Sequence, residues 1–376
     1  MQKERQSFID WIRVLAFAIL IFYHSGMFFV SWGWHVKNNV IVESLTYPML
    51  FFSQWRLSLL FFISGVGISF ALKSRTVWSF AAERTLRLFI PIVFGMLVIV
   101  PPQVYFERTQ AHQIAVSYAQ FYPSVFEFIP YPKGNLTWNH LWFVKYLLIH
   151  SFIGIPIFLS LRSKTGQHLL AKFYQFILHP IRIYLMMIPF MILFWMWDKT
   201  FPTTNNLIHE KFNLINFFLL VIIGFVLGQA KSFWEMTEKY RKEYLWAVLV
   251  FGILFFWVVE KRIGLSDDQY FITKGIITRL NTFSDILCIC GFAKYYLNFT
   301  NKGLQYANEA VFPFYILHQT ITVAIGFYIA DFNWVWQLKL IILMLGTFFG
   351  AWGIYHFLIR PFNFIRLLFG VKSREN

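Results

Sequence analysis

The composition of this 376-residue chain excludes an ordinary soluble protein. It is 58% hydrophobic, 21% aromatic and only 14% charged, with a mean hydropathy of +0.55, whereas soluble domains carry about 25% charged residues. We therefore expect an all-α polytopic membrane protein whose first partner is the lipid bilayer. The net charge of +15 would suit nucleic acid, but no aromatic and basic nucleic-acid motif accompanies it. Basic loops beside a membrane explain the charge better.

Neither the cysteines nor the N-terminal run indicates a processed, disulfide-linked protein. Cys288 and Cys290 are two residues apart in an apolar stretch, on different sides of a helix, so no disulfide framework is expected. The first apolar run contains Arg13 and His24 and has no small-residue cleavage site. It is therefore predicted to be a transmembrane helix and not a cleavable signal peptide.

Ten apolar runs are long enough to cross a bilayer, which takes about 20 helical residues. In chain order they lie near residues 8–30, 45–72, 85–104, 138–161, 181–198, 213–229, 243–259, 273–297, 309–329 and 336–360. An even number of spans places both termini on the same side. Lys and Arg gather at the termini and after even-numbered spans, so the positive-inside rule predicts that both termini are cytoplasmic.

The longest connection, near residues 105–137, is interrupted by prolines and glycine and is too short and irregular for a separate domain. No internal repeat is visible, and the spans lack the paired, interrupted pattern of inverted-repeat transporters. We predict one membrane domain over residues 1–376, placed as a multi-pass protein in a bacterial cytoplasmic (inner) membrane.

The first span contains the stretch RVLAFAILIFYH, in which Arg13 and His24 flank ten uncharged residues. Eleven helical steps of about 100° bring both side chains to one face, roughly 16 Å apart along the axis. An imidazole in a span is a functional candidate, as a general base or as a nucleophile that carries an acyl group. A guanidinium near the inner boundary suits a phosphate or carboxylate, although a snorkelling positive-inside residue is the competing interpretation.

Two further cations open the third span in the stretch ERTLRLFIP. Arg84 and Arg87 are three residues apart and share a helix face ahead of Pro91. Together with Arg13 they could hold a phosphorylated donor. Flanking positive charge explains them equally well.

The second span holds Arg56 deep in the stretch WRLSLLFFISGVGISF, where an arginine must meet an anion, a carbonyl or water. The small residues that follow indicate close helix packing; they are Ser64, Gly65, Gly67 and Ser69. The other titratable candidates within spans are Lys145, His150, Arg279, Asp285, His318, Lys339 and His356. Lys339 and His356 lie near span ends and are expected to reach the headgroup region.

On the predicted outer face, SWGWH at residues 31–35 and TWNH at residues 137–140 mix tryptophan with polar side chains. Aromatic belts at the membrane interface explain such tryptophans. The alternative is an acceptor site, in which Trp138 stacks on a sugar ring beside Asn139 and His140.

Five stretches, in this order, resemble the membrane acyltransferase family 3. They are the arginine, ten residues and histidine of the first span, then FFISG, ERTLRLFIP, HLWFVKYLL and PFYILHQT. The chain is most similar to the glucan biosynthesis protein C type, through RLSLLFFISG, NTFSDILCICGFAKYYLN and NEAVFPFYILHQT. Apolar helices imitate one another, so each motif is weak alone, but together they cover nearly the whole chain.

The resemblance implies transfer of acetyl, succinyl or related acyl groups to carbohydrate hydroxyls outside the cytoplasm. It implies that the first-span histidine, His24, is essential and that Arg13 handles the donor. The chain departs from the family at Lys145, where many members carry an acidic residue. This departure leaves no obvious carboxylate to orient His24.

The resulting hypothesis is an O-acyltransferase with acyl-CoA as co-substrate, an extracytoplasmic glycan such as a periplasmic glucan as acceptor, and no permanently bound cofactor or metal. Phosphates held by the three arginines of the first and third spans would let a pantetheine arm of roughly 16 Å bring the thioester to His24. Arg56 or another polar group would stabilise the oxyanion, and His318 would support the site.

Two other functions use the same residues differently. A transporter or flippase for an anionic or glycosyl substrate would use the intramembrane arginine and histidine as a substrate path. An interaction scaffold without a substrate would need neither side chain.

Overall fold

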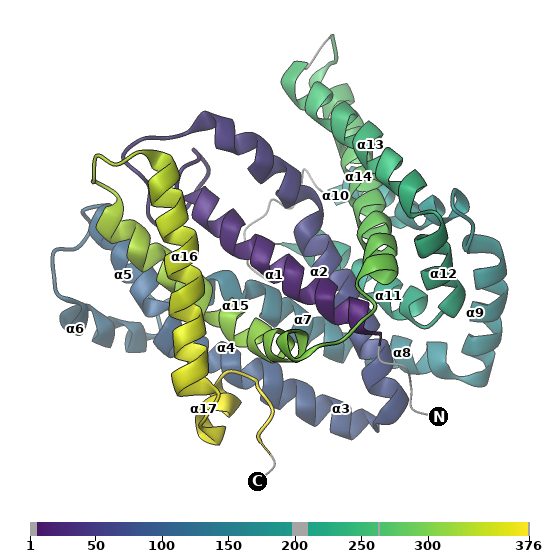
Figure 1. The fold of residues 1–376 in the computed structure, drawn as a ribbon, viewed down its shortest axis with the longest axis horizontal. Helices are drawn as coiled ribbons and strands as arrows, with labels where there is room; N and C mark the ends of the chain where they lie inside the picture. Colours follow the sequence, from purple (N-terminus) through teal and green to yellow (C-terminus); the bar gives the residue numbers. More distant parts are fainter. Residues whose placement is uncertain (1–5, 198–209, 262–263, 375–376) are drawn as a thin grey trace. The chain divides into compact units, whose positions relative to one another are not determined.

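The computed structural model describes residues 6–197, 210–261 and 264–374. Within them the regular secondary structure is helical apart from one isolated bridge between Pro130 and Leu136. The α-helices labelled in Figure 1 are α1 Ser7–Met27, α2 Thr46–Ser74, α3 Val77–Arg84, α4 Ile90–Phe94, α5 Pro101–Gln110, α6 Tyr118–Phe121, α7 Trp142–Ile153, α8 Ile155–Arg162, α9 Lys164–Ile177, α10 Ile188–Trp197, α11 Lys211–Gly228, α12 Lys231–Lys239, α13 Arg241–Lys261, α14 Asp267–Tyr296, α15 Lys302–Ile329, α16 Trp336–Ile354 and α17 Asn363–Leu368. The 3-10 helices are Glu43–Leu45, Tyr122–Glu127, Asn139–Leu141 and Arg182–Met187, and the π-helical turns are Thr85–Phe89, Gly95–Ile99 and Tyr355–Ile359.

Eight helical segments of the described residues are long and apolar enough to cross a membrane. They are Ser7–Met27, Glu43–Ser74, Val77–Gln110, Lys211–Gly228, Arg241–Glu260, Asp267–Tyr296, Lys302–Ile329 and Trp336–Ile359. Two bent helix pairs raise the number to ten if each pair is one span. The all-α, multi-pass character is thereby confirmed, whereas the number ten and the cytoplasmic termini stay predictions.

The first bent pair lies where a span was predicted near 138–161, and the second joins a helix that precedes the span predicted near 181–198 to the helix of that span. The first bends by 50° between Asn139–Ile153 and Ile155–Arg162, and the second by 120° between Lys164–Ile177 and Arg182–Trp197. Pro156 stands in the first turn of α8, and Pro180 lies within the second break. Proline lacks the amide hydrogen and clashes with the preceding turn, which explains both breaks. The predicted end at residue 198 lies outside the described residues.

Contacts between residues divide the chain into two compact units. Unit 1 comprises Met1–Arg13, Phe51–Phe80 and Ile149–Asn301, and unit 2 comprises Val14–Leu50, Ala81–Leu148 and Lys302–Asn376. Within unit 1, α13 and α14 lie side by side, and within unit 2, α15 packs against α16 and α5 (Figure 1). One membrane domain over residues 1–376 stays a prediction.

Two glycines of unit 1 let α2 and α11 approach closely. A Cβ atom on Gly65 would lie 2.0 Å from the carbonyl oxygen of Val221, and one on Gly224 would lie 2.0 Å from that of Phe62. Both obstacles are backbone atoms, which cannot rotate aside as a side chain would. The close packing predicted for the small residues of the second span is thereby confirmed at Gly65.

Gly65→Ala is expected to lower the stability of the fold by at least about 1–3 kcal/mol, because the two backbones must separate. Gly67→Ala is the matched control. The nearest atom to a Cβ at this position would be the Nη2 of Arg13, at 4.0 Å. Alanine is the better helix former by about 1 kcal/mol, so this variant should be at least as stable as the parent. Thermal unfolding of the purified proteins in detergent measures the difference, and an equal loss in both variants would contradict the close approach.

Lys339 anchors the start of α16 inside unit 2. It is fully buried, and its Nζ donates to Asn38 Oδ1 at 2.6 Å and Asn39 Oδ1 at 3.1 Å. A third bond of 2.8 Å goes to the carbonyl oxygen of Ala330. The expectation that Lys339 reaches the headgroup region is therefore wrong, because acceptors within the protein take all three of its donors.

Candidate functional site

Two histidines from different helices of unit 2 are in direct contact. His24 lies in the last turn of α1, and His318 lies within α15. The Nε2 atom of His318 is 2.8 Å from the Nδ1 atom of His24, and the ring centroids are 4.8 Å apart. His318 is buried, with 1% of its surface exposed. The partner that orients His24 is therefore a second imidazole and not a carboxylate.

The hydrogen bonds of His318 determine where the protons of this pair lie. Its Nδ1 is 2.6 Å from the carbonyl oxygen of Tyr315, and a carbonyl only accepts, so this nitrogen carries the hydrogen. In a neutral imidazole the Nε2 of His318 is then the acceptor, and His24 donates to it from Nδ1. The basic nitrogen of His24 is consequently Nε2.

Aromatic side chains of unit 2 surround the two histidines. The Trp34 ring lies 5.0 Å from that of His24 and 5.4 Å from that of His35, measured between centroids. The His140 ring meets that of His318 edge-on at 5.4 Å, and its Nε2 donates to the carbonyl oxygen of Ile316 at 3.0 Å. Trp34 and His140 thus connect the pair to a larger polar network.

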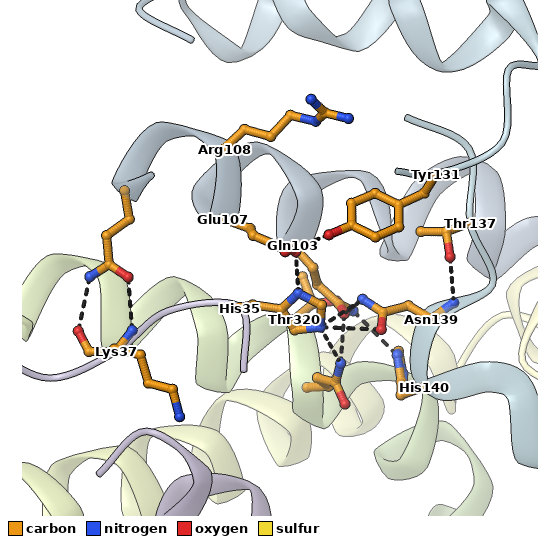
Figure 2. A network of polar contacts seen from close by, with 12 residues as sticks. His35, Lys37, Gln103, Glu107, Arg108, Tyr131, Thr137, Asn139, His140 and Thr320 are labelled. Atoms are coloured by element: carbon orange, nitrogen blue, oxygen red, sulfur yellow. Dashed lines mark hydrogen bonds and ion pairs between the residues drawn. The ribbon is translucent and has the colours of Figure 1, made fainter. Parts of the chain in front are cut away.

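That network is built around His35 and Glu107 (Figure 2). The Nδ1 of His35 lies 2.5 Å from the Oε2 of Glu107. On the other side of the ring, amide nitrogens of Asn139 and Gln319 lie 2.9 Å and 3.1 Å from Nε2. The amide oxygen Oδ1 of Asn139 also lies 3.2 Å from Nε2. Since a carboxylate only accepts, Nδ1–H donates to Glu107, and the result is a carboxylate–histidine dyad.

Gln103 holds the centre of the network. Its Oε1 accepts from the amide of Asn139 at 2.7 Å and from that of Gln319 at 3.0 Å. Its Nε2 donates to Thr320 Oγ1 at 2.6 Å and lies 3.4 Å from His140 Nδ1. Gln103 is completely buried, and a buried amide is tolerated because both ends are paired.

The backbone of Asn139 is strained in a way that serves this network. Its φ is +42°, a left-handed conformation that costs most residues about 1–2 kcal/mol and that asparagine tolerates better. Asn139 begins the 3-10 turn that leads into α7. The strained turn directs its amide to both His35 and Gln103, as Figure 2 shows.

The connection between α6 and α7 closes over the dyad. Tyr131 donates from its hydroxyl to the second carboxylate oxygen of Glu107 at 2.7 Å. Burial, together with this bond, raises the pKa of Tyr131 to about 12, so the phenol stays protonated and remains a donor at neutral pH. Arg108 Nη2 binds the carbonyl oxygens of Pro132 and Gly134 at 2.8 Å and 2.9 Å, which holds this connection on α5.

Lys37 secures the end of α1, where His24 lies. Its Nζ donates to the carbonyl oxygens of Met27 and Val30 at 2.8 Å and 2.6 Å. Burial lowers the pKa of Lys37 to about 8, which still leaves most of it charged at neutral pH. The side-chain amide of Gln110 binds both the backbone N–H and the carbonyl of Lys37, at 2.8 Å and 2.9 Å (Figure 2).

The arginines expected to bind the donor are distributed over both units. Arg13, in unit 1, forms a 3.5 Å ion pair with Asp10. Arg84 ends α3, and Arg87 lies in the following π-helical turn, where it binds Glu83 at 3.3 Å and the carbonyl oxygen of Gly370 at 3.0 Å. Arg56 is buried in unit 1, so its oxyanion role stays a prediction.

The residues expected to bind the acceptor all lie in unit 2. Asn139 and His140 belong to the polar network described above, beside His318. Trp138 is covered on one face by the ammonium of Lys145, whose Nζ lies 3.4 Å from the centre of the ring. A sugar ring would therefore have to stack on the opposite face of Trp138.

Sequence reasoning did not single out His35, Glu107, Gln103 or Gln319. The only signal was the polar stretch around Trp34 and His35, because Glu107 lies 72 residues further along the chain. Glu107 also falls just beyond the predicted end of the third span, where a charged residue is unremarkable.

The chain matches known proteins over nearly its whole length. A family model described as "Acyltransferase domain" covers residues 6–356. Curated relatives named "Glucans biosynthesis protein C" from Escherichia coli O157:H7 and from Escherichia coli K12 are 22% and 23% identical over 356 residues. In each case 91% of this chain and 89% of the relative are aligned. No solved structure matches the chain significantly.

The helical membrane architecture and the family match define the class of protein. The chain belongs to the membrane acyltransferase family described by this model, and it is an enzyme of the acyltransferase type. Among its relatives it is similar to the glucan biosynthesis proteins C named above.

Glu107→Leu is expected to lower stability by about 1.5–3 kcal/mol, because it leaves the His35 N–H and the Tyr131 hydroxyl without their acceptor. Tyr131→Phe is the matched control, since it removes one of the two donors and leaves the carboxylate on His35. Thermal unfolding of the purified variants measures both. If the two substitutions had the same small effect, the dyad would not organise this part of unit 2.

Proposed function

We propose that the protein transfers an acyl group, such as acetyl or succinyl, from acyl-CoA to hydroxyl groups of an extracytoplasmic carbohydrate, such as a periplasmic glucan. The family match supports the acyl transfer. The name of the relatives, glucan biosynthesis protein C, supports a glucan as acceptor. The proposal includes ten spans, cytoplasmic termini and a place in the bacterial inner membrane, in keeping with the distribution of Lys and Arg.

The observation that carries the proposal is the hydrogen bond between His24 and His318. It holds the His24 ring still and puts the proton on Nδ1, so Nε2 is the atom able to take a proton from an alcohol. The carbonyl of Tyr315 and the ring of His318 also stabilise the positive charge that develops on His24. This arrangement is the imidazole counterpart of a carboxylate–histidine pair.

In the proposed reaction, the acceptor hydroxyl gives its proton to Nε2 of His24 while its oxygen attacks the thioester carbonyl carbon. The C–O bond forms, the C–S bond breaks, and the thiolate leaves with the proton from His24. In the second route His24 is the nucleophile and carries the acyl group before the alcohol accepts it. Both routes need an unprotonated Nε2.

Other residues complete the proposal. Arg13, Arg84 and Arg87 contact the phosphates of the donor, and Arg56 stabilises the oxyanion, an effect commonly worth about 3–4 kcal/mol. Trp138, Asn139 and His140 contact the acceptor, and the adjoining His35–Glu107 dyad gives this region further hydroxyl-binding groups.

His24→Ala is expected to abolish ester-linked acetate and succinate on envelope carbohydrate, because no other group supplies the base. His168→Ala, an exposed histidine of α9, is the matched control and should leave acylation unchanged. Ester content is measured in cells that contain equal amounts of each variant. Full acylation by His24→Ala would remove the enzymatic proposal and favour a transporter for the same substrates.

His318→Ala is expected to lower kcat by about 100-fold with little change in KM for the acceptor, because His318 positions the base. His318→Gln should recover part of the rate, since its amide oxygen can accept from His24 Nδ1. Steady-state kinetics with purified protein separate kcat from KM. A rise in KM alone would assign His318 to substrate binding.

A further inference from the structure

An apolar groove of about 340 Å³ runs through unit 2 between α1, α15 and α16. Its walls include Val14, Phe17 and Ile21 of α1, Ala310 of α15 and Phe348 of α16. His318 lines one end, and Tyr306 and Trp352 line the other. Because His318 contacts His24, the groove is continuous with the candidate site.

The length of the groove matches a long, narrow ligand. Tyr306 and His318 lie twelve residues apart on α15, which corresponds to about 18 Å along a helix axis. A ligand that fills the groove therefore has one end at the histidine pair and the other beside Tyr306 and Trp352.

The end at Tyr306 is bordered by two basic side chains. The Arg360 guanidinium lies 5.0 Å from the centre of the Tyr306 ring. His356 accepts or donates a 3.0 Å hydrogen bond with the Tyr306 hydroxyl, and its ring stacks on Trp352 with centroids 5.3 Å apart. His356 lies within the π-helical turn Tyr355–Ile359, and Arg360 follows it; the N–H of Arg360 bonds to the carbonyl of Tyr355, five residues earlier. Such one-residue expansions of a helix are common at functional sites.

The acidic side chain at this end of the groove, Glu309, already forms an ion pair with another cation. Glu309 accepts from Arg366 at 3.1 Å and 3.2 Å and from the Tyr355 hydroxyl at 2.6 Å. Arg360 forms no ion pair within the part of the chain that the structure describes, and its buried Nε has no hydrogen bond there. This end of the groove therefore carries an uncompensated positive charge, which favours an anionic ligand.

We propose that Arg360 and His356 bind phosphate groups of the acyl-CoA donor and that the groove holds the arm between these phosphates and the thioester. The inference rests on the proposed function and extends it to residues outside the first and third spans. Three features select this occupant. The groove has two basic side chains beside its Tyr306 end, its walls are apolar, and its other end, about 18 Å away along α15, lies at the histidine pair. A phospholipid fits less well, because its ester carbonyls adjoin its phosphate and would lie far from His24.

Binding of coenzyme A to the purified full-length protein in detergent tests the inference without catalysis. Arg360→Gln is expected to weaken coenzyme A binding by about tenfold or more, the range of a lost charge-assisted contact. Pantetheine, which has the arm but no phosphates, should bind the parent and this variant alike. Lys302→Gln removes an exposed charge from the same end of α15 and should change neither affinity.

A second variant tests whether the groove holds the arm of coenzyme A. Ala307 lines the groove and is only half-buried, so Ala307→Phe narrows it without a large change to the fold. This variant is expected to weaken coenzyme A and pantetheine together. Competition by a fatty acid that is stronger than competition by pantetheine would instead identify a lipid chain as the occupant and overturn the inference.

The results separate this inference from the proposed function. His24→Ala should lose acylation and keep coenzyme A binding, which supports both. Unchanged coenzyme A binding by Arg360→Gln would overturn the inference and leave the role of His24 intact. A parent protein that acylates through His24 but does not bind coenzyme A would likewise overturn it, because the donor would then belong to another class.

Discussion

The chemistry of the candidate site depends on one hydrogen bond, from His24 to His318. An isolated imidazole in a membrane span exchanges its proton between two nitrogens and rotates about its side-chain bonds. Here the carbonyl of Tyr315 keeps a proton on Nδ1 of His318, and the Nε2 of that ring accepts from His24 and so keeps a proton on Nδ1 of His24. A backbone carbonyl of α15 therefore determines, through the ring of His318, which nitrogen of His24 is basic.

Unit 2 surrounds this pair with two unlike environments. One is the network of Gln103, Asn139, Gln319 and the His35–Glu107 dyad, in which buried polar groups are paired with one another (Figure 2). The other is the apolar groove that ends at Tyr306 and Trp352, beside Arg360 and His356. A hydrophilic acceptor suits the first environment and a long amphiphilic donor suits the second. The imidazole pair lies where the two meet.

Much of the fold was predictable because membrane spans are long and apolar, and the bilayer sets their length. The two bent helix pairs have Pro156 or Pro180 at or next to their breaks, and hydropathy alone does not register such breaks. Lys339 was misread for a related reason: composition shows that a lysine lies near a span end, but not that three acceptors await it inside the protein.

Within the site, His24 was selected as the histidine of the first span, and His318 followed from a resemblance in PFYILHQT. The His35–Glu107 pair did not, since residues 72 positions apart meet only through tertiary packing. The phosphate-binding role proposed for Arg360 could not be inferred from the sequence for a different reason. Arg360 follows a π-helical turn, and a pattern based on the α-helical period of 3.6 misplaces any residue beyond such an insertion.

The most direct test of the central claim is the protonation state of the two His24 nitrogens, read from ¹⁵N chemical shifts of histidine-labelled protein in a membrane at neutral pH. The His24 signals are assigned by their absence in His24→Gln. We predict a protonated Nδ1 and an unprotonated Nε2, with this preference lost in His318→Ala. A proton on Nε2 of His24 in the parent protein, unaffected by His318→Ala, would contradict the account.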